Sequence, residues 1–475
     1  MTQSNKAIRK RNVILIAASF VATLAVFQFI KKGVFKQLNI IDPVPEHVTF
    51  TEHVSTILYD HCVQCHRPNG SGPFQLISYE QVLRKKKTIK KVVSKGIMPP
   101  WPADPEYSHF VGENVLSELE KEILFKWIDT DFAYGDSSFL KEPPTFNALS
   151  NLGVPDLTIY MDSVWIEGNN RDKFLVVKSP FELLNDTFIR AIEFIPGEHN
   201  LVHHLNGHLL NYDYGKKRNV LDGKRVIDIE IHPDAFLEEF EAMKAYNDDG
   251  SRPNRVHSAI NYLPGVVGTM YPEGIGGFEV KQKAALYAKN LHFGPIQEGL
   301  WDYSHYNIFF SKVRPERPTS ELMLGTNGIS PINPPLVIDA DSIQTFTTRY
   351  RTLKDISILT INPHMHLLGK HFKAYAVTLE DDTIPLIRIK RWDFRWQYFY
   401  TFTKMKFVPK GSSIVVEATF DNTSQNPNNP FDPPRTLSER FDLEGASMRT
   451  KDEMFQFIIT YLDYRVGDEN IPLEP

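Results

Sequence analysis

The spacing of apolar residues changes along the chain and separates three kinds of structure. Val13–Ile30 is an almost unbroken apolar run close to the ~17-residue minimum for a helix that spans a bilayer. Residues 47–135 carry helix-like stretches, including Ser117–Asp131. From Asp156 onward the apolar positions fall in short runs separated by turn residues, a pattern typical of strands.

The strand-like runs form two groups on either side of a proline-rich stretch, Arg314–Pro335. The predicted strands are Phe174–Val177, Phe188–Phe194, His208–Tyr212, Val226–Ile231, Phe278–Phe293, Tyr306–Val313, Ser342–Tyr350, Ile356–Ile361, Lys373–Leu379, Ser412–Phe420 and Met454–Tyr464. Asp234–Tyr246 is the one helical exception. Two consecutive antiparallel β-sandwich domains fit this pattern.

The expected fold is therefore mainly β, with two tandem antiparallel β-sandwich domains after a small all-α domain and an N-terminal transmembrane helix. The expected boundaries are 1–40 for a cytoplasmic stub and anchor, 45–135 for the α domain, 136–155 for a linker, 156–313 for the first sandwich, 314–335 for a second linker, and 336–475 for the second sandwich. A chain of 475 residues exceeds what one core normally organises.

The apolar run near the N-terminus has two readings. A cleavable signal peptide has a shorter apolar region followed by a small-residue cleavage site. No such site follows Ile30, and Lys31, Lys32 and Lys36 come next. We therefore expect a retained single-pass anchor, although basic residues flank both of its ends and charge alone does not orient it.

Composition narrows the possible partners. The formal net charge of −5 argues against nucleic acid as the main partner.

The sequence holds only two cysteines, and they lie in Cys62-Val63-Gln64-Cys65-His66. This C-x-x-C-H spacing is the attachment motif of a c-type heme, with Cys62 and Cys65 bonded to the vinyl groups and His66 on the iron.

The competing interpretations of this motif are a redox dithiol and half of a zinc site. A thioredoxin-like dithiol needs a βαβ context, which the pattern lacks, and a zinc site needs a second pair of ligands at suitable spacing. The sequence thus predicts one covalent heme c. Because bacterial heme attachment takes place outside the cytoplasm, the bulk of the chain is expected in the periplasm, anchored in the inner membrane.

Met98 is the predicted second iron ligand. It lies in Gly96-Ile97-Met98-Pro99-Pro100-Trp101, where the prolines end a basic helix and hold an extended loop. A core methionine, with His109, His61 or His53 on the iron, is the alternative. With Met98 as ligand, residues 47–135 resemble a small class I cytochrome c.

Histidines cluster in the β region. His203 and His204 are adjacent, His292 ends a strand, and His364 and His366 are separated by one residue at another strand end. Residues two apart on a strand share a face, so His364 and His366 can bind one ion. Adjacent histidines point to opposite faces unless a bulge or a strand end intervenes, and buried histidines are often only core residues.

Four motifs occur in order: Val202-His203-His204, Leu291-His292-Phe293-Gly294, His364-Met365-His366-Leu367-Leu368-Gly369 and Thr450-Lys451-Asp452-Glu453-Met454. Together they resemble the type II copper, ascorbate-dependent monooxygenases, which include the peptidylglycine and dopamine hydroxylases. Tyr271–Gly276, Arg391–Phe394 and Phe420–Thr423 are similar too, so the resemblance runs from about Pro155 to the C-terminus.

The resemblance implies two coppers. His203, His204 and His292 would hold an electron-transfer copper, and His364, His366 and Met454 would hold the catalytic copper at which oxygen is activated. Imidazole suits both copper oxidation states and a thioether favours Cu(I). The peptide-amidating members have an arginine where this chain has Asn362, which puts a C-terminal carboxylate substrate in doubt.

The predicted function is a membrane-anchored periplasmic heme–copper oxidoreductase that hydroxylates a C–H bond with O2. Its partners would be an unidentified small-molecule substrate and a periplasmic or membrane electron donor to the heme. The alternatives are a non-enzymatic electron-transfer or copper-binding scaffold in a larger membrane assembly, and an oxidase or peroxidase that reduces oxygen without hydroxylating anything.

Overall fold

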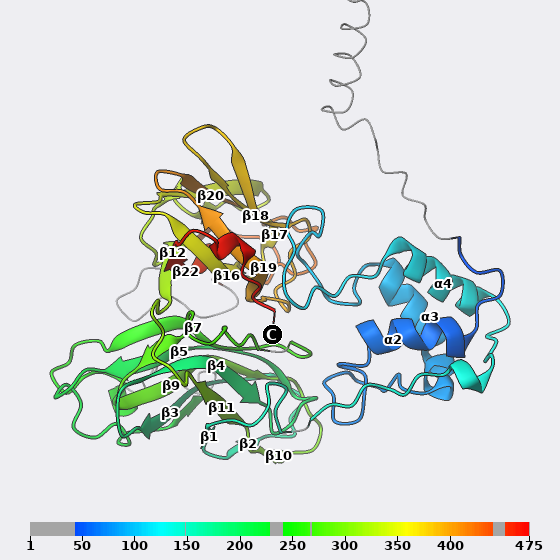
Figure 1. The fold of residues 1–475 in the computed structure, drawn as a ribbon, viewed down its shortest axis with the longest axis horizontal. Coiled ribbons are helices and arrows are strands. Elements are labelled where there is room, and N and C mark those ends of the chain that lie inside the picture. Colours follow the sequence, from blue (N-terminus) through cyan, green and yellow to red (C-terminus); the bar gives the residue numbers. More distant parts are fainter. Residues whose placement is uncertain (1–42, 148, 229–240, 267, 440–451, 475) are drawn as a thin grey trace, which may run out of the picture.

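The computed structural model describes residues 43–147, 149–228, 241–266, 268–439 and 452–474. The predicted anchor at 13–30 and most of the predicted helix at 234–246 lie outside these ranges. None of the helices within them is long and apolar enough to cross a membrane. Figure 1 shows a small helical unit beside two stacked β sandwiches.

The helical unit, residues 43–135, contains one π-helical turn and three α-helices. These are η1 (Phe50–Val54), α2 (Ser55–His61), α3 (Tyr79–Ser94) and α4 (Glu118–Asp129). Ser78 and Ser117 each begin a helix with a capping box, in which the side chains of Gln81 and Glu120 bond back to the cap backbone. The helix predicted at 117–131 is therefore confirmed as α4.

Aromatic side chains fill the core of the helical unit. Trp127 is fully buried and its indole N–H donates to Ala133 O at 3.0 Å. Phe50 and Tyr79 pack edge to face with ring centroids 5.4 Å apart, and Trp127 lies 6.1 Å from both rings. This core is separate from the cores of the two sandwiches.

The first sandwich pairs a four-stranded sheet, in the order β1-β11-β4-β8, with a five-stranded sheet, in the order β6-β3-β9-β5-β7. Its strands are β1 (Leu157–Tyr160), β2 (Val164–Ile166), β3 (Lys173–Glu182), β4 (Thr187–Ile195), β5 (Val202–Tyr212), β6 (Val226–Asp228), β7 (Asn254–Tyr262), β8 (Phe278–Val280), β9 (Lys283–Phe293), β10 (Leu300–Asp302) and β11 (His305–Phe310). All pairings are antiparallel, and β2 and β10 form a separate ribbon.

The second sandwich repeats this plan with sheets β12-β22-β16-β19 and β13-β15-β20-β17-β18. Its strands are β12 (Ser320–Gly325), β13 (Ile332–Asn333), β14 (Val337–Ile338), β15 (Ile343–Arg351), β16 (Ile356–His364), β17 (Gly369–Val377), β18 (Thr383–Ile389), β19 (Tyr400–Val408), β20 (Ser413–Asp421), β21 (Leu437–Ser438) and β22 (Gln456–Asp463). Mainly β architecture with sandwich-like sheets is thus as expected.

Three local expectations differ from the structure. The run predicted as one strand at 278–293 is interrupted at residues 281–282 and forms β8 and β9 in different sheets. The stretch 314–335, expected as a linker, contains β12, which pairs with β22 inside the second sandwich. Strands β7, β18 and β19 are the longest of the strands that were not predicted, because polar or charged residues or a proline interrupt their apolar positions.

The two sandwiches share an apolar interface. Leu359, Met405 and Leu462 belong to the second sandwich by sequence, yet they pack into the core cluster of the first. Leu263 of the first sandwich packs into the core of the second. Because burial of apolar area resists separation, this shared core fixes the relative position of the two sandwiches.

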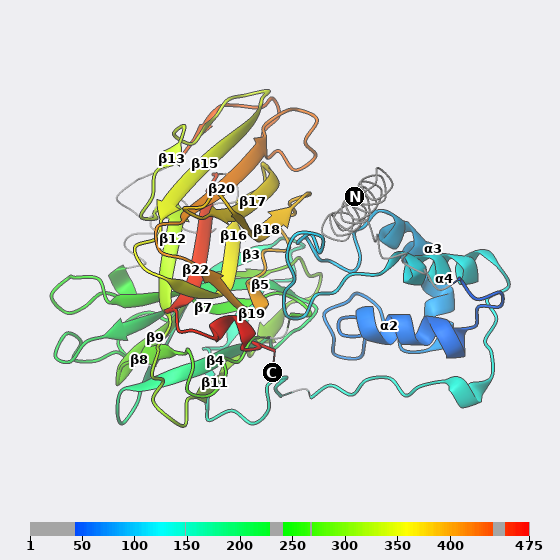
Figure 2. The same ribbon diagram turned by 45° about the horizontal axis from the view of Figure 1, so that its top comes forward.

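The helical unit reaches the second sandwich through residues 95–113, which we call the docking segment. Ala103 and Phe110 of this segment make bridges with Ile389 and Phe402. Figure 2 shows this segment lying between the helices and the sheet that contains β17 and β18. Part of the predicted α domain therefore packs on the second sandwich.

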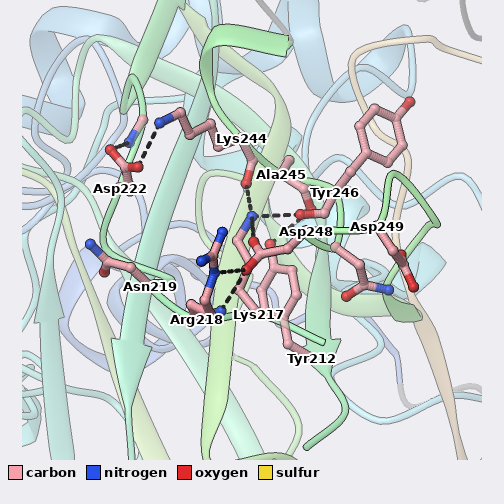
Figure 3. A network of polar contacts seen from close by, with 12 residues as sticks. Tyr212, Lys217, Arg218, Asn219, Asp222, Lys244, Ala245, Tyr246, Asp248 and Asp249 are labelled. Carbon is pink, nitrogen blue, oxygen red and sulfur yellow. Dashed lines mark hydrogen bonds and ion pairs between the residues drawn. The ribbon is translucent and has the colours of Figure 1, made fainter. Parts of the chain in front are cut away.

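A lobe between β5 and β7 is held by lysines that donate to backbone carbonyls (Figure 3). Lys217 Nζ donates to Lys244 O at 2.7 Å and to Tyr246 O at 2.5 Å. The fully buried Lys178 donates to Asp222 O at 2.6 Å and also to Met243 O. These contacts hold the lobe together and do not involve the histidines considered below.

Candidate metal centres

The first histidine cluster consists of His203, His204 and His292. His203 and His204 lie at the start of β5, and His292 lies near the end of β9 directly opposite His204. The pairing of β5 with β9 shifts register between Val202 and His204. This bulge interrupts the regular alternation of side chains along β5, which allows the adjacent His203 and His204 to point toward one site.

The three imidazoles converge. The His292 ring centroid is 4.8 Å from that of His203 and 5.0 Å from that of His204. Gly294 allows this approach, because a Cβ at that position would lie 2.5 Å from His203 Nε2. The structure therefore brings the three predicted ligands together at one strand edge.

The protonation of this cluster suits a metal. Burial, followed by the neighbouring His292 and His203, lowers the pKa of His204 to about 3. Burial also lowers the pKa of His203 and of His292, so all three rings are neutral at pH 7. Metal binding needs the neutral imidazole. His204 Nε2 is buried and has no hydrogen-bond partner among the described residues, which a bound cation would remedy.

Two residues of this site were missed by sequence reasoning. Asp172 Oδ1 lies 2.8 Å from His292 Nε2, and Phe174 stacks on the same ring with centroids 4.2 Å apart. Donor atoms of Asp172, His203 and His292 all lie within 4.8 Å of one another. Asp172 carries no local motif, and only the pairing of β3 with β9 brings it to the histidines.

The second histidine cluster consists of His364 and His366, and the buried Met454 follows Asp452 and Glu453, which both bond to His366. His364 ends β16, and the ring of His366 lies 5.0 Å from it at an angle of 88°. Burial, followed by the neighbouring His366, lowers the pKa of His364 well below its usual value. His364 is therefore neutral at pH 7.

Hydrogen bonds set the tautomers of this cluster. His364 Nδ1 donates to Gln397 Oε1 at 2.5 Å, and the Gln397 amide is oriented by its own bond to Phe394 O at 2.8 Å. His366 Nδ1 donates to Asp452 O at 2.5 Å. With both protons on Nδ1, Nε2 of each ring is the nitrogen with a lone pair to offer a metal.

Glu453 fastens the turn that carries His366. This carboxyl group is 3% exposed and accepts from His366 N at 3.0 Å and from Leu368 N at 2.7 Å. Burial raises the pKa of Glu453 to about 8. These two hydrogen bonds hold Glu453, and with it the adjacent Met454, which is 3% exposed, at this turn. Thr450 and Lys451 of the same motif lie outside the described residues.

Phe394 lies between the two clusters. Its ring centroid is 6.3 Å from His204 and 5.6 Å from His366. The sum of these distances, about 12 Å, is an upper limit for the separation of the two imidazoles. The clusters therefore face each other, one from each sandwich, with an aromatic ring between them.

The C-x-x-C-H segment forms a helical turn at the end of α2. His66 Nδ1 donates to Phe74 O at 2.8 Å, and the His66 ring packs against Phe74. This leaves Nε2 as the ring nitrogen available to iron. Burial raises the pKa of the Cys62 thiol to about 12, and thioether bonds would remove that titration.

This segment lies at the seam between the sandwiches. Cys65 Sγ packs against Gly265, which leaves no room for a side chain there, and the Cys65 side chain lies near enough to Tyr262 and Tyr398 to interact with both. Tyr262 ends β7 opposite Leu205, the neighbour of His204. Tyr398 follows Gln397, which holds His364. The segment thus contacts residues whose neighbours belong to, or hold, a histidine of each cluster.

Met98 lies just beyond α3, where its N–H faces Val92 O. The docking segment that follows it is anchored to the second sandwich, with Tyr398 Oη donating to Pro100 O at 2.6 Å. The assignment of Met98 as second iron ligand stays a prediction.

Comparison with known proteins supports the copper interpretation for part of the chain. Residues 329–429 match the family model of the copper type II ascorbate-dependent monooxygenase, C-terminal domain. This region holds His364, His366, Phe394 and Gln397. No curated protein matches the chain. The second sandwich therefore contains a monooxygenase-like copper domain, and the match supports copper as a cofactor and an oxidoreductase of the monooxygenase type.

Proposed function

We propose that this chain is a membrane-anchored periplasmic monooxygenase that hydroxylates a C–H bond, with a copper at each histidine cluster and a covalent heme c as the electron entry. The observation that supports it best is that Phe394 contacts a histidine of each cluster, His204 of the first and His366 of the second. Copper would supply one-electron chemistry for reducing oxygen. The heme would supply single electrons from an external donor.

The protein residues have separable tasks in this proposal. His203, His204 and His292 hold one copper, and His364, His366 and Met454 hold the other. Gln397 and the Asp452 carbonyl keep the second-cluster protons on Nδ1, so that the metal-binding nitrogens need no rearrangement. Phe394 lies against a histidine of each cluster, while Cys62, Cys65 and His66 would hold the heme.

The test combines metal analysis with oxygen uptake on anaerobically purified, heme-loaded full-length protein. We expect two coppers per chain and oxygen uptake when a reductant is supplied. His203→Ala and His364→Ala should each remove one copper, and both should suppress uptake. Retention of both coppers in both variants would contradict the ligand assignment.

Two further measurements distinguish the alternatives. If the amount of hydrogen peroxide formed equals the amount of oxygen consumed, whichever organic compound is supplied as substrate, the result would favour an oxidase. Copper binding without oxygen uptake would favour the electron-transfer scaffold. For the heme, Cys65→Ala should abolish the heme band that survives denaturing electrophoresis, and a wild-type chain without that band would contradict the heme assignment.

A further inference from the structure

Among the described residues, Asp172 is the one carboxylate with an oxygen within 4.8 Å of ring nitrogens of two cluster histidines, His203 and His292. It immediately precedes β3, and its Oδ1 is 2.8 Å from His292 Nε2. A carboxylate can only accept here, so the His292 proton is on Nε2 and the lone pair is on Nδ1.

The His292 ring is constrained on two sides. Phe174, two residues after Asp172, pairs with His292 across the β3–β9 ladder and stacks on its ring at 10° between planes. The side chain of His292 is 13% exposed, whereas that of Asp172 is 50% exposed. The ring is thus held by stacking on its face and by a hydrogen bond at its tip, with Nδ1 left for the metal.

We infer that Asp172 is the positioning residue of the first histidine cluster, holding His292 with Nδ1 toward the copper and biasing the site toward Cu(II). This inference rests on the proposed function. A negative charge beside the cluster stabilises the ion of higher charge, so it should lower the reduction potential of this copper. The first site is then an imidazole cluster with a charged partner, which the all-histidine description lacked.

Two substitutions separate charge from geometry. Asp172→Asn keeps an oxygen that can accept from His292 Nε2 but removes the charge, whereas Asp172→Ala removes both. Loss of the partner of a metal-bound histidine typically weakens metal binding by about 10–100-fold. We expect Asp172→Asn to weaken Cu(II) binding about tenfold with little effect on Cu(I), and Asp172→Ala to weaken Cu(II) binding about 100-fold.

The measurement is an anaerobic redox titration of copper-loaded, full-length protein, followed by the Cu(II) electron paramagnetic resonance of the first site. A tenfold selective loss of Cu(II) affinity raises the potential by about 59 mV, and a 100-fold loss raises it by about 120 mV. Asp162→Asn, at an exposed position in the same sandwich, is the matched control and should leave the potential unchanged.

The outcomes are distinguishable. An unchanged potential in both Asp172 variants, with copper still bound, would overturn this inference and leave the proposed function standing. Equal loss of Cu(I) and Cu(II) would also overturn it, because that pattern indicates only a damaged site. A wild-type chain without copper at His203, His204 and His292 would overturn the proposed function first.

Discussion

Glu453 offers the sharpest test of how the fold prepares the second histidine cluster. Its buried carboxyl group accepts two backbone N–H groups, from His366 and Leu368, and so closes the turn after β16. Glu453→Ala would leave both N–H groups buried without an acceptor. Each such group costs about 1–3 kcal/mol, so unfolding free energy should fall by about 2–6 kcal/mol.

Glu453→Gln gives an intermediate perturbation. Its amide oxygen can accept from one N–H, while its NH2 group faces the other donor. We therefore expect a loss of about 1–3 kcal/mol, which corresponds to one unsatisfied donor. Because His366 is carried by the same turn, both variants should weaken copper binding at the second cluster and leave the first unchanged.

The assay is urea unfolding followed by fluorescence and circular dichroism, together with copper titration of the folded protein. Glu380→Ala, at an exposed turn of the same sandwich, is the control and should change stability by no more than about 0.5 kcal/mol. If Glu453→Ala and Glu380→Ala were equally stable, the two hydrogen bonds would not hold the turn and the reasoning would be refuted.

Three further predictions concern other parts of the molecule. Gly294→Ala should displace the His203 ring and abolish copper binding at the first cluster alone, as measured by metal titration, since the new Cβ would lie 2.5 Å from Nε2. Asp104→Asn should loosen the docking segment by about 1–3 kcal/mol, seen as faster proteolysis, because Asp104 accepts from Arg388 Nε at 2.6 Å. Burial lowers the pKa of Lys289 to about 8 in the folded protein. Above that pH the unfolded chain binds more protons than the folded protein, so the free energy of unfolding should rise from pH 8 to about 10. Lys289→Met should flatten this rise in urea titrations.

Each of these three predictions has a contrary outcome. Full copper occupancy of Gly294→Ala would mean that the His203 ring can move without loss of binding. Unchanged cleavage of Asp104→Asn would mean that the bridges at Ala103 and Phe110 suffice for docking. Identical pH profiles for wild type and Lys289→Met would show that this lysine keeps its charge as easily in the folded protein as in the unfolded chain.

Local chemistry made several features readable from the sequence alone. The C-x-x-C-H turn and the helix over 118–129 depend on residues a few positions apart, and Ser117 with Glu120 marks the start of that helix. The apolar-rich run at Ile356–Ile361 predicted a strand, and the structure shows why Ile358 and Leu359, two adjacent positions, are both apolar. Ile358 faces the core of the second sandwich while Leu359 packs into the first.

The assembly of the site depended on the tertiary structure. A bulge in β5 turns His203 and His204 toward His292, and strand pairing supplies Asp172, which no spacing rule indicates. Phe394 reaches both clusters only because the sandwiches share a core. Sequence patterns report which side chains can bind a metal, since donor chemistry belongs to each residue. Which donors meet is decided by contacts between residues far apart in the sequence, such as the 87 positions between His366 and Glu453 and the 120 between Asp172 and His292, and those contacts form only when the strands pair and the sheets pack.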